Sequence, residues 1–368
     1  MEKAWLSMVN LIERSLDSGS MKRVDKTPFD IIHEEDLLSV RHYPALTRES
    51  VTIANQTIPV LNKVHRVPLV LIPPLAVGAF IFDLYPQRSL VSYYLAQGFD
   101  VYLINWGNPD RDHSHLSFET YLLDWMPKAI QHIREYSGKQ ELSLFGYCMG
   151  GLFSLIYTAV HEDAAIRNIV TVASPIDMHQ MGAAGKVFTM TYQPAHRLAR
   201  AFNFKLINVN PKYLHISGKL GTIGFWLTNP IGNFTSFWDF ILHLWDRDYL
   251  ISHDSMGHWF NNMVDYPGAT MKSIVVHMWI ENQLAQGKMT VGEKEANLKQ
   301  IHASLLSFAG NDDKIVSLKS SRKIMDVITA EDKEFRVVPG GHAGVFAGRK
   351  AVDYVWGASA EWLARRSN

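Results

Sequence analysis

The stretch from Leu142 to Gly151 constrains the fold of this chain more than any other segment. Its first residues form a short apolar run rich in strand formers, and a run suited to a helix begins at Leu152. Between the two lies the pattern Gly-x-Cys-x-Gly, which places Cys148 in the strand–turn–helix setting of a nucleophile elbow. So tight a turn favours glycine on either side, because Cβ atoms there would meet the neighbouring strand and helix.

Cys148 also has a simpler interpretation. It is the only cysteine among 368 residues, so no disulfide partner competes for it. A lone cysteine is most often a buried, small apolar residue without a chemical role. The five-residue pattern leaves both interpretations open, and the rest of the chain has to decide between them.

The composition is that of a folded protein with a large core, because 47% of the residues are hydrophobic and 20% are charged. The formal net charge is zero, which gives no support for a nucleic-acid partner. A single cysteine suits a reducing compartment, so we expect the protein in the cytoplasm. Residues 1–18 lack the uninterrupted apolar run of a signal peptide. We expect no transmembrane segment, because no stretch of about 18 apolar residues occurs.

Apolar runs alternate with helix-compatible runs through most of the chain. Most of the predicted strands are apolar on both faces, which indicates an α/β fold with a mostly parallel sheet covered by helices on both sides. The predicted strands are 67–74, 99–106, 142–146, 166–173, 303–310 and 334–339, and the predicted helices are 83–97, 117–136, 152–160, 318–328 and 350–366.

Two segments interrupt this alternation and suggest three parts of the chain. Residues 1–60 form an N-terminal helix and edge segment, and residues 177–301 form a mostly helical cap, or lid, rich in Trp, Phe, Met and His. The α/β core then comprises residues 61–176 and 302–368. The aromatic residues of the cap have three possible roles: the core of the cap itself, an apolar acyl-binding channel, or a subunit interface. The sequence leaves these alternatives open.

The N-terminal helix is predicted to be amphipathic. One face can collect Trp5, Met8, Val9, Ile12 and Leu16. Such a helix packs on its own domain or serves as an arm that binds a partner or a surface, and the pattern favours neither.

Three candidate groups for catalysis each follow a predicted strand: Cys148, the pair Asp312 and Asp313, and His342. Nucleophile, acid and histidine in this order are typical of an α/β-hydrolase. The histidine would deprotonate the thiol, and the carboxylate would hold the imidazole in one tautomer. Taken singly, the aspartates also fit a solvated turn and His342 a surface histidine. Their combined positions favour a Cys–His–Asp triad.

A developing oxyanion needs backbone amides aimed at it. The amide of Met149, at the start of the helix after the elbow, is the first candidate. The second comes from the turn after the first predicted strand, at Leu75 or Ala76. His113 and His115 lie in a loop without a spaced carboxylate or cysteine, so we expect no metal site.

From about residue 67 to the C-terminus the chain resembles the catalytic domain of the polyhydroxyalkanoate synthases, which polymerise bacterial storage polyesters. The motifs that carry the resemblance are Ile72-Pro73-Pro74, Asp83-Leu84, Leu103-Ile104-Asn105-Trp106-Gly107-Asn108-Pro109-Asp110, Gly146-Tyr147-Cys148-Met149-Gly150-Gly151, Asp313-Lys314-Ile315-Val316 and Gly340-Gly341-His342-Ala343-Gly344. In the family pattern the catalytic Asp directly precedes a basic residue, then Ile or Leu, then Val. The resemblance therefore selects Asp313 over Asp312.

The resemblance also implies the reaction. A 3-hydroxyacyl group would pass from its coenzyme A thioester to Cys148 and then to a growing polyester, with no bound cofactor. It implies a partner, either an accessory synthase subunit or a second copy in a homodimer, and a position in the cytoplasm at the surface of a polyester granule.

Two positions depart from the family pattern. Val77 stands where the oxyanion turn has Asn, and Lys314 replaces the usual His after the acid. The same triad also suits a thioesterase or esterase, in which water replaces the acceptor hydroxyl. A granule-associated subunit that kept the fold without catalysis is the third alternative.

Overall fold

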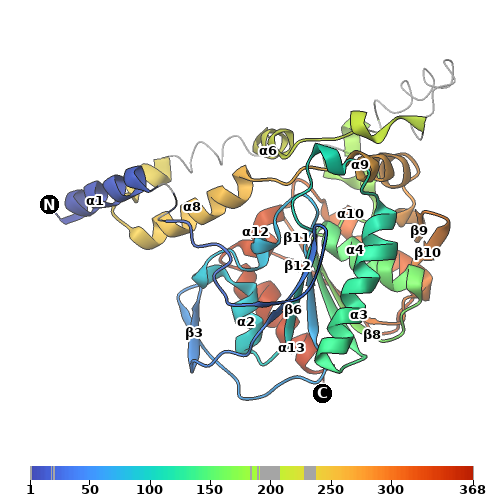
Figure 1. The fold of residues 1–368 in the computed structure, drawn as a ribbon, viewed down its shortest axis with the longest axis horizontal. Coiled ribbons are helices and arrows are strands. Elements are labelled where there is room, and N and C mark those ends of the chain that lie inside the picture. Colours follow the sequence, from blue (N-terminus) through green and yellow to red (C-terminus); the bar gives the residue numbers. More distant parts are fainter. Residues whose placement is uncertain are drawn as a thin grey trace.

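The computed structural model describes residues 2–17, 19, 21–182, 185–188, 190, 208–227 and 238–367. Its centre is an eight-stranded sheet in the order β1-β2-β6-β5-β7-β8-β11-β12 (Figure 1). The strands from β6 to β12 in this order run parallel, and β1 and β2 add antiparallel pairings at one edge. The mostly parallel sheet predicted from the sequence is confirmed.

The strands of this sheet are β1 (Asp30–Glu35), β2 (Leu38–Tyr43), β5 (Leu69–Ile72), β6 (Val101–Asn105), β7 (Leu142–Tyr147), β8 (Ile166–Val172), β11 (Ser304–Gly310) and β12 (Lys333–Val338). Two hairpins pair β3 (Ser50–Ile53) with β4 (Gln56–Pro59) and β9 (Lys288–Val291) with β10 (Lys294–Asn297).

The α-helices are α1 (Glu2–Leu16), α2 (Leu90–Ala96), α3 (Met126–Ser137), α4 (Met149–His161), α6 (Gly218–Leu227), α8 (Arg247–Asn261), α9 (Gly268–Ser273), α10 (Leu318–Arg322), α11 (Ile324–Val327), α12 (His342–Ala347) and α13 (Ala358–Ala364). The π-helical turns are η4 (Thr120–Trp125), η8 (Ile274–Ile280) and η11 (Val352–Gly357). The 3-10 turns are η1 (Ala79–Phe82), η2 (Pro86–Arg88), η3 (Arg111–His113), η5 (Met178–Gln180), η7 (Pro211–Tyr213), η9 (Leu284–Gln286) and η10 (Leu298–Gln300).

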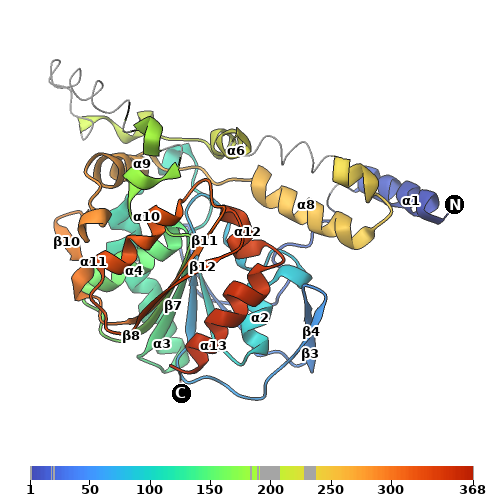
Figure 2. The ribbon, with the colours of Figure 1, turned by 180° about the vertical axis from the view of Figure 1, so that it is seen from behind.

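The sheet separates two apolar cores, because successive side chains of a strand point to opposite faces. Along β5, Val70 and Ile72 pack with α3 and α4, whereas Leu69 and Leu71 pack with α2, α12 and α13. Figures 1 and 2 show these two helical layers on either side of the strands. The site-bearing ends of the strands are thus held by a sheet that is buried on both faces.

The helix predicted over 83–97 is much shorter in the structure. Its first half contains the 3-10 turn η2, and α2 begins only at Leu90. Ser89 caps this helix, because its side chain accepts a hydrogen bond from the amide of Ser92. Pro86 lies at the start of η2, where its missing N–H needs no acceptor. The sequence pattern placed the apolar residues correctly but not the start of the helix.

The cap elements lie over the carboxyl ends of the parallel strands, beside α12 (Figure 1). Residues 183–184, 189, 191–207 and 228–237 of the predicted cap lie outside the described residues. Within the described part, β10 packs against α4, and Met289 and Val291 of β9 are buried in the same apolar core as α4. The domain boundaries predicted from the sequence stay a prediction.

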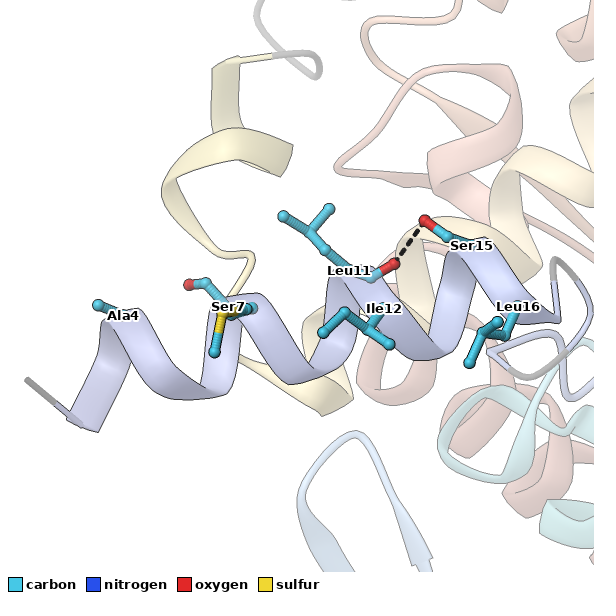
Figure 3. A pocket seen from close by; sticks show the side chains of 7 residues that line it. Ala4, Ser7, Leu11, Ile12, Ser15 and Leu16 are labelled. Atoms are coloured by element: carbon cyan, nitrogen blue, oxygen red, sulfur yellow. Dashed lines mark hydrogen bonds between the residues drawn. The ribbon is translucent and has the colours of Figure 1, made fainter.

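Helix α1 projects from the body beside α8 (Figures 1 and 2). Polar side chains of α1 make its contacts with the protein. Asn10 donates to the carbonyl of Leu244, and Glu13 and Arg14 pair with α8. The opposite side is an apolar row that faces outward (Figure 3), formed by Ala4, Ser7, Met8, Leu11, Ile12, Ser15 and Leu16. Within the described residues, no helix is both long and apolar enough to span a membrane.

The first turn of α4 packs directly on the backbone at the end of β5. A Cβ atom on Gly150 would lie 1.9 Å from the carbonyl oxygen of Ile72, and a Cβ on Gly146 would lie 2.3 Å from the amide nitrogen of Gly151. Contacts this short exclude any side chain, so these glycines set how close the helix comes to the sheet.

We expect Gly150→Ala to lower the free energy of unfolding by at least ~2 kcal/mol, because overpacking outweighs the gain in helix propensity. Urea denaturation followed by circular dichroism measures this change. Gly257→Ala in α8 is the matched control, because a Cβ there meets only the end of the Asn261 side chain, at 3.9 Å. Equal stability of the two variants would contradict the role assigned to Gly150.

Candidate active site

Cys148 occupies the sharp turn between β7 and α4. Its φ of 53° and ψ of −117° are unusual for a residue with a side chain. Hydrogen bonds to the Cys148 backbone hold the turn. The Cys148 amide donates to the carbonyl of Val172 at 2.8 Å, and the Cys148 carbonyl accepts from the amide of Gly151 at 3.1 Å and the hydroxyl of Ser174 at 2.9 Å. The strained backbone therefore presents the thiol at a set position above the sheet.

Asp313 lies in the turn after β11, with its carboxylate completely buried. One carboxylate oxygen accepts from the amides of Ile315 and Val316, at 2.9 and 2.8 Å. The other lies 2.8 Å from Nδ1 of His342. Asp312, by contrast, is exposed. Their position in the turn made both Asp312 and Asp313 candidates for the acid. The structure places Asp313 beside the histidine.

His342 is the first residue of α12, directly after the turn that follows β12. The side chain of Tyr147, the residue before Cys148, contacts His342. The Tyr147 hydroxyl donates to the backbone carbonyl of His342 at 3.1 Å, and the two ring centroids are 5.4 Å apart. The ring of Phe346 also stacks on the Tyr147 ring, with 4.4 Å between the ring centroids. The tyrosine thus connects the cysteine turn to the histidine turn.

The electrostatics of the site favour the charged form of the histidine. Burial alone would lower the pKa of His342, but the negative charge of Cys148 and the hydrogen bonds to Asp313 and Cys148 outweigh it and raise the pKa to about 10. The imidazole is therefore held in its protonated form by the two groups beside it.

The three amides predicted to hold an oxyanion lie in two turns, one directly after Cys148 and one after β5. Met149 is the first residue of α4, so its amide has no acceptor within the helix. Leu75 and Ala76 form the turn after β5, which Trp106 steadies by donating its indole N–H to the carbonyl of Pro73 at 3.0 Å. Among the described backbone groups, the amides of Leu75 and Ala76 have no acceptor. The role of all three amides stays a prediction.

The cap is hydrogen-bonded to this turn. The amide of Val264 donates to the carbonyl of Ala76 at 2.9 Å, and Met263 pairs with Val77 as an isolated bridge. Tyr266 follows in the same segment and pairs with Ile216. The segment 263–266 therefore joins the rest of the cap to the oxyanion turn by backbone contacts.

Sequence reasoning missed two tyrosines of the site. Burial, followed by the charge of nearby Cys148, raises the pKa of both Tyr147 and Tyr266, which keeps their hydroxyls neutral. The position of Tyr147 next to the cysteine was a usable signal. Tyr266 lies 118 residues away from Cys148 in the chain, and nothing in its local sequence points to the site. His113 bonds Asp110, and no group of metal-binding side chains occurs within the described residues.

Comparisons with known proteins agree with this geometry. The model of the alpha/beta hydrolase fold family matches residues 68–348. The poly(3-hydroxyalkanoate) polymerase subunit PhaC of Haloferax mediterranei is 26% identical over 99% of this chain and 70% of its own. The subunit of the same name from Allochromatium vinosum is 27% identical over 82% of this chain and 81% of its own. The resemblance drawn from the motifs is confirmed.

Among solved structures, a soluble variant of the monoglyceride lipase of Saccharomyces cerevisiae superposes with a TM-score of 0.52. The two are 14% identical, and the match covers 94% of this chain and 96% of the lipase chain. A likeness at this identity concerns the fold alone. It agrees with the fold family and carries no statement about substrate.

Removal of the thiol should change the titration of the histidine. In Cys148→Ala the imidazolium loses its negative partner, so we expect His342 to release its proton at a lower pH than in the unchanged protein, where its pKa is about 10. Proton NMR of the imidazole signals against pH measures this, with His342→Gln to assign the resonance. Cys148→Ser should behave like the alanine variant. An unchanged titration would show that no thiolate–imidazolium pair exists.

Proposed function

Because the chain belongs to the alpha/beta hydrolase fold family, and its relatives include polymerase subunits, we propose that it is a polyester synthase. It transfers 3-hydroxyacyl groups from coenzyme A thioesters to a growing polyhydroxyalkanoate chain. The single observation that carries this proposal is the dyad of Cys148 and His342, backed by Asp313, at the carboxyl ends of parallel strands.

The first half-reaction loads the enzyme. The Cys148 thiolate attacks the thioester carbonyl, and the amide of Met149, with that of Leu75 or Ala76, receives the oxyanion. Collapse of the tetrahedral intermediate releases the sulfur of coenzyme A, which takes the proton of the His342 imidazolium. One thioester is exchanged for another, so the acyl-enzyme stays reactive toward an alcohol.

The second half-reaction forms the ester bond. After loading, His342 is neutral, and its Nδ1 is held by the carboxylate of Asp313 at 2.8 Å. The free Nε2 accepts the proton of an incoming hydroxyl, whose oxygen attacks the acyl group on Cys148. Expulsion of the thiolate restores the starting pair and leaves an ester. Repetition of this step lengthens the polyester.

The choice of acceptor separates a synthase from a hydrolase with the same residues. Water would give a free hydroxy acid, so polymerisation requires that water be kept from the acyl-enzyme. The cap segment at Val264, which is hydrogen-bonded to the turn of Ala76, and the partly buried ring of Tyr266 supply apolar cover at that point. We include in the proposal an accessory synthase subunit or a second copy as partner, and action at the surface of the insoluble product.

The test is incubation of the purified protein with 3-hydroxybutyryl-coenzyme A and longer-chain analogues, measuring coenzyme A release and the acyl product together. We expect coenzyme A and insoluble polyester, and neither from Cys148→Ala. Release of free 3-hydroxy acid in place of polyester would make the protein a thioesterase. A protein that turns over none of the thioesters, alone or with an accessory subunit, would contradict both enzyme assignments.

The two neighbouring aspartates offer a matched comparison. Asp313→Asn should reduce the turnover number by about 10²–10⁴-fold, because the amide leaves the imidazole in the wrong tautomer. Asp312→Asn should stay within about twofold of the unchanged enzyme, since its side chain is exposed. Initial rates of coenzyme A release measure both. Equal losses in the two variants would remove the distinction between the aspartates.

A further inference from the structure

A second polar site lies away from the thiol, in a cavity of about 300 Å³. Its walls come from η2, the turn between β3 and β4, the first two turns of α8, and Arg349 just after α12. Three arginines line this cavity: Arg23, Arg88 and Arg349.

Arg88 is the most unusual of the three. Only 9% of it is exposed, yet it forms no ion pair with a carboxylate of the described residues. Its partners are neutral: the carbonyl of Gln87, at 3.4 Å, and the hydroxyl of Tyr85. Buried guanidinium groups in proteins are ordinarily paired with an anion, because desolvation of a lone charge is costly. Among the described residues, the Arg88 side chain therefore lacks a counter-ion.

The neighbouring charges do not supply the missing negative partner of Arg88. Burial lowers the pKa of the Arg88 guanidinium, and the nearby charge of Arg349 lowers it too. Asp246 and Asp248 also line the cavity, but neither lies within ion-pair distance of these arginines in the described structure. Asp246 is engaged as the cap of α8, where it accepts from the amide of Tyr249 at 3.1 Å. Three cations against two carboxylates leave the cavity positive.

We propose that this cavity binds the phosphate groups of a nucleotide-sized ligand. Guanidinium groups offer paired N–H donors that match phosphate oxygens, and Arg88 and Arg349 approach the same space from different elements. The volume exceeds what one inorganic phosphate fills and lies within the range of small-molecule sites. An anion there supplies the missing partner of Arg88.

The position of the cavity suggests one source of these phosphates. Arg349 follows His342 by seven residues, most of them in α12, a rise of about 10 Å. Tyr249 also lines the cavity, and α8 extends about 18 Å from Tyr249 to Asn261. Two residues after Asn261, Met263 pairs with Val77 beside the proposed oxyanion turn. The pantetheine arm of coenzyme A spans distances of this order. This assignment rests on the proposed function, whereas phosphate binding itself does not.

Direct binding tests the site without turnover. Isothermal titration with adenosine 3′,5′-bisphosphate, the nucleotide end of coenzyme A, and with pyrophosphate should show binding that weakens with salt. Arg349→Gln should weaken it by about tenfold, and Arg88→Gln by more, as expected for charge-assisted hydrogen bonds. Arg349 is exposed, so its variant should fold even if the Arg88 variant does not. Arg167→Gln, an exposed arginine near Glu141 on the sheet, is the control.

Kinetics distinguish the two sources. If the phosphates are those of the substrate, Arg349→Gln raises KM for 3-hydroxybutyryl-coenzyme A but not for 3-hydroxybutyryl-pantetheine, which lacks the nucleotide. If the variant binds the probes weakly but both KM values are unchanged, the site holds a separate phosphate compound. Absence of probe binding by the unchanged protein, or equal binding by all three variants, would overturn the proposal. If the unchanged protein binds the phosphate probes but turns over no thioester, the proposed function is contradicted and the phosphate site is not.

Discussion

The close packing of α4 against the end of β5 is the contact on which the rest of the site depends. At Gly150 and Gly146 the backbones approach to distances that leave no room for a Cβ. This approach places the start of α4 against the end of β5, directly after Cys148 in its strained conformation. The strain is tolerated because the buried sheet on both sides over-determines the turn.

The charge of the histidine depends on the groups around it. His342 is largely shielded from water, and Cys148 and Asp313 together favour its protonated form. Asp313 is in turn held by two backbone amides, which keeps its second oxygen available for the histidine. A cysteine suits such a site better than a serine, because a thiolate is formed at neutral pH far more readily than an alkoxide.

The cap and the N-terminal arm are attached in different ways. The cap segment at Val264 donates a backbone hydrogen bond to Ala76, in the turn after β5. Helix α1 is attached through its polar side, by contacts such as Glu13 with Arg247, and presents apolar residues outward. Exposed ion pairs contribute little to stability, so this arm is held less firmly than the sheet-bound helices.

Local sequence was sufficient for the elements that follow local rules. The glycine pattern around Cys148, the apolar strand before it and the turn before His342 indicated the fold and the order of the site residues, because strand ends and tight turns leave short-range signatures. Two features required the tertiary structure: the outward apolar side of α1, and the cavity of Arg88 and Arg349, residues 261 positions apart. Each depends on what packs against a side chain from a distant segment, which no local pattern encodes.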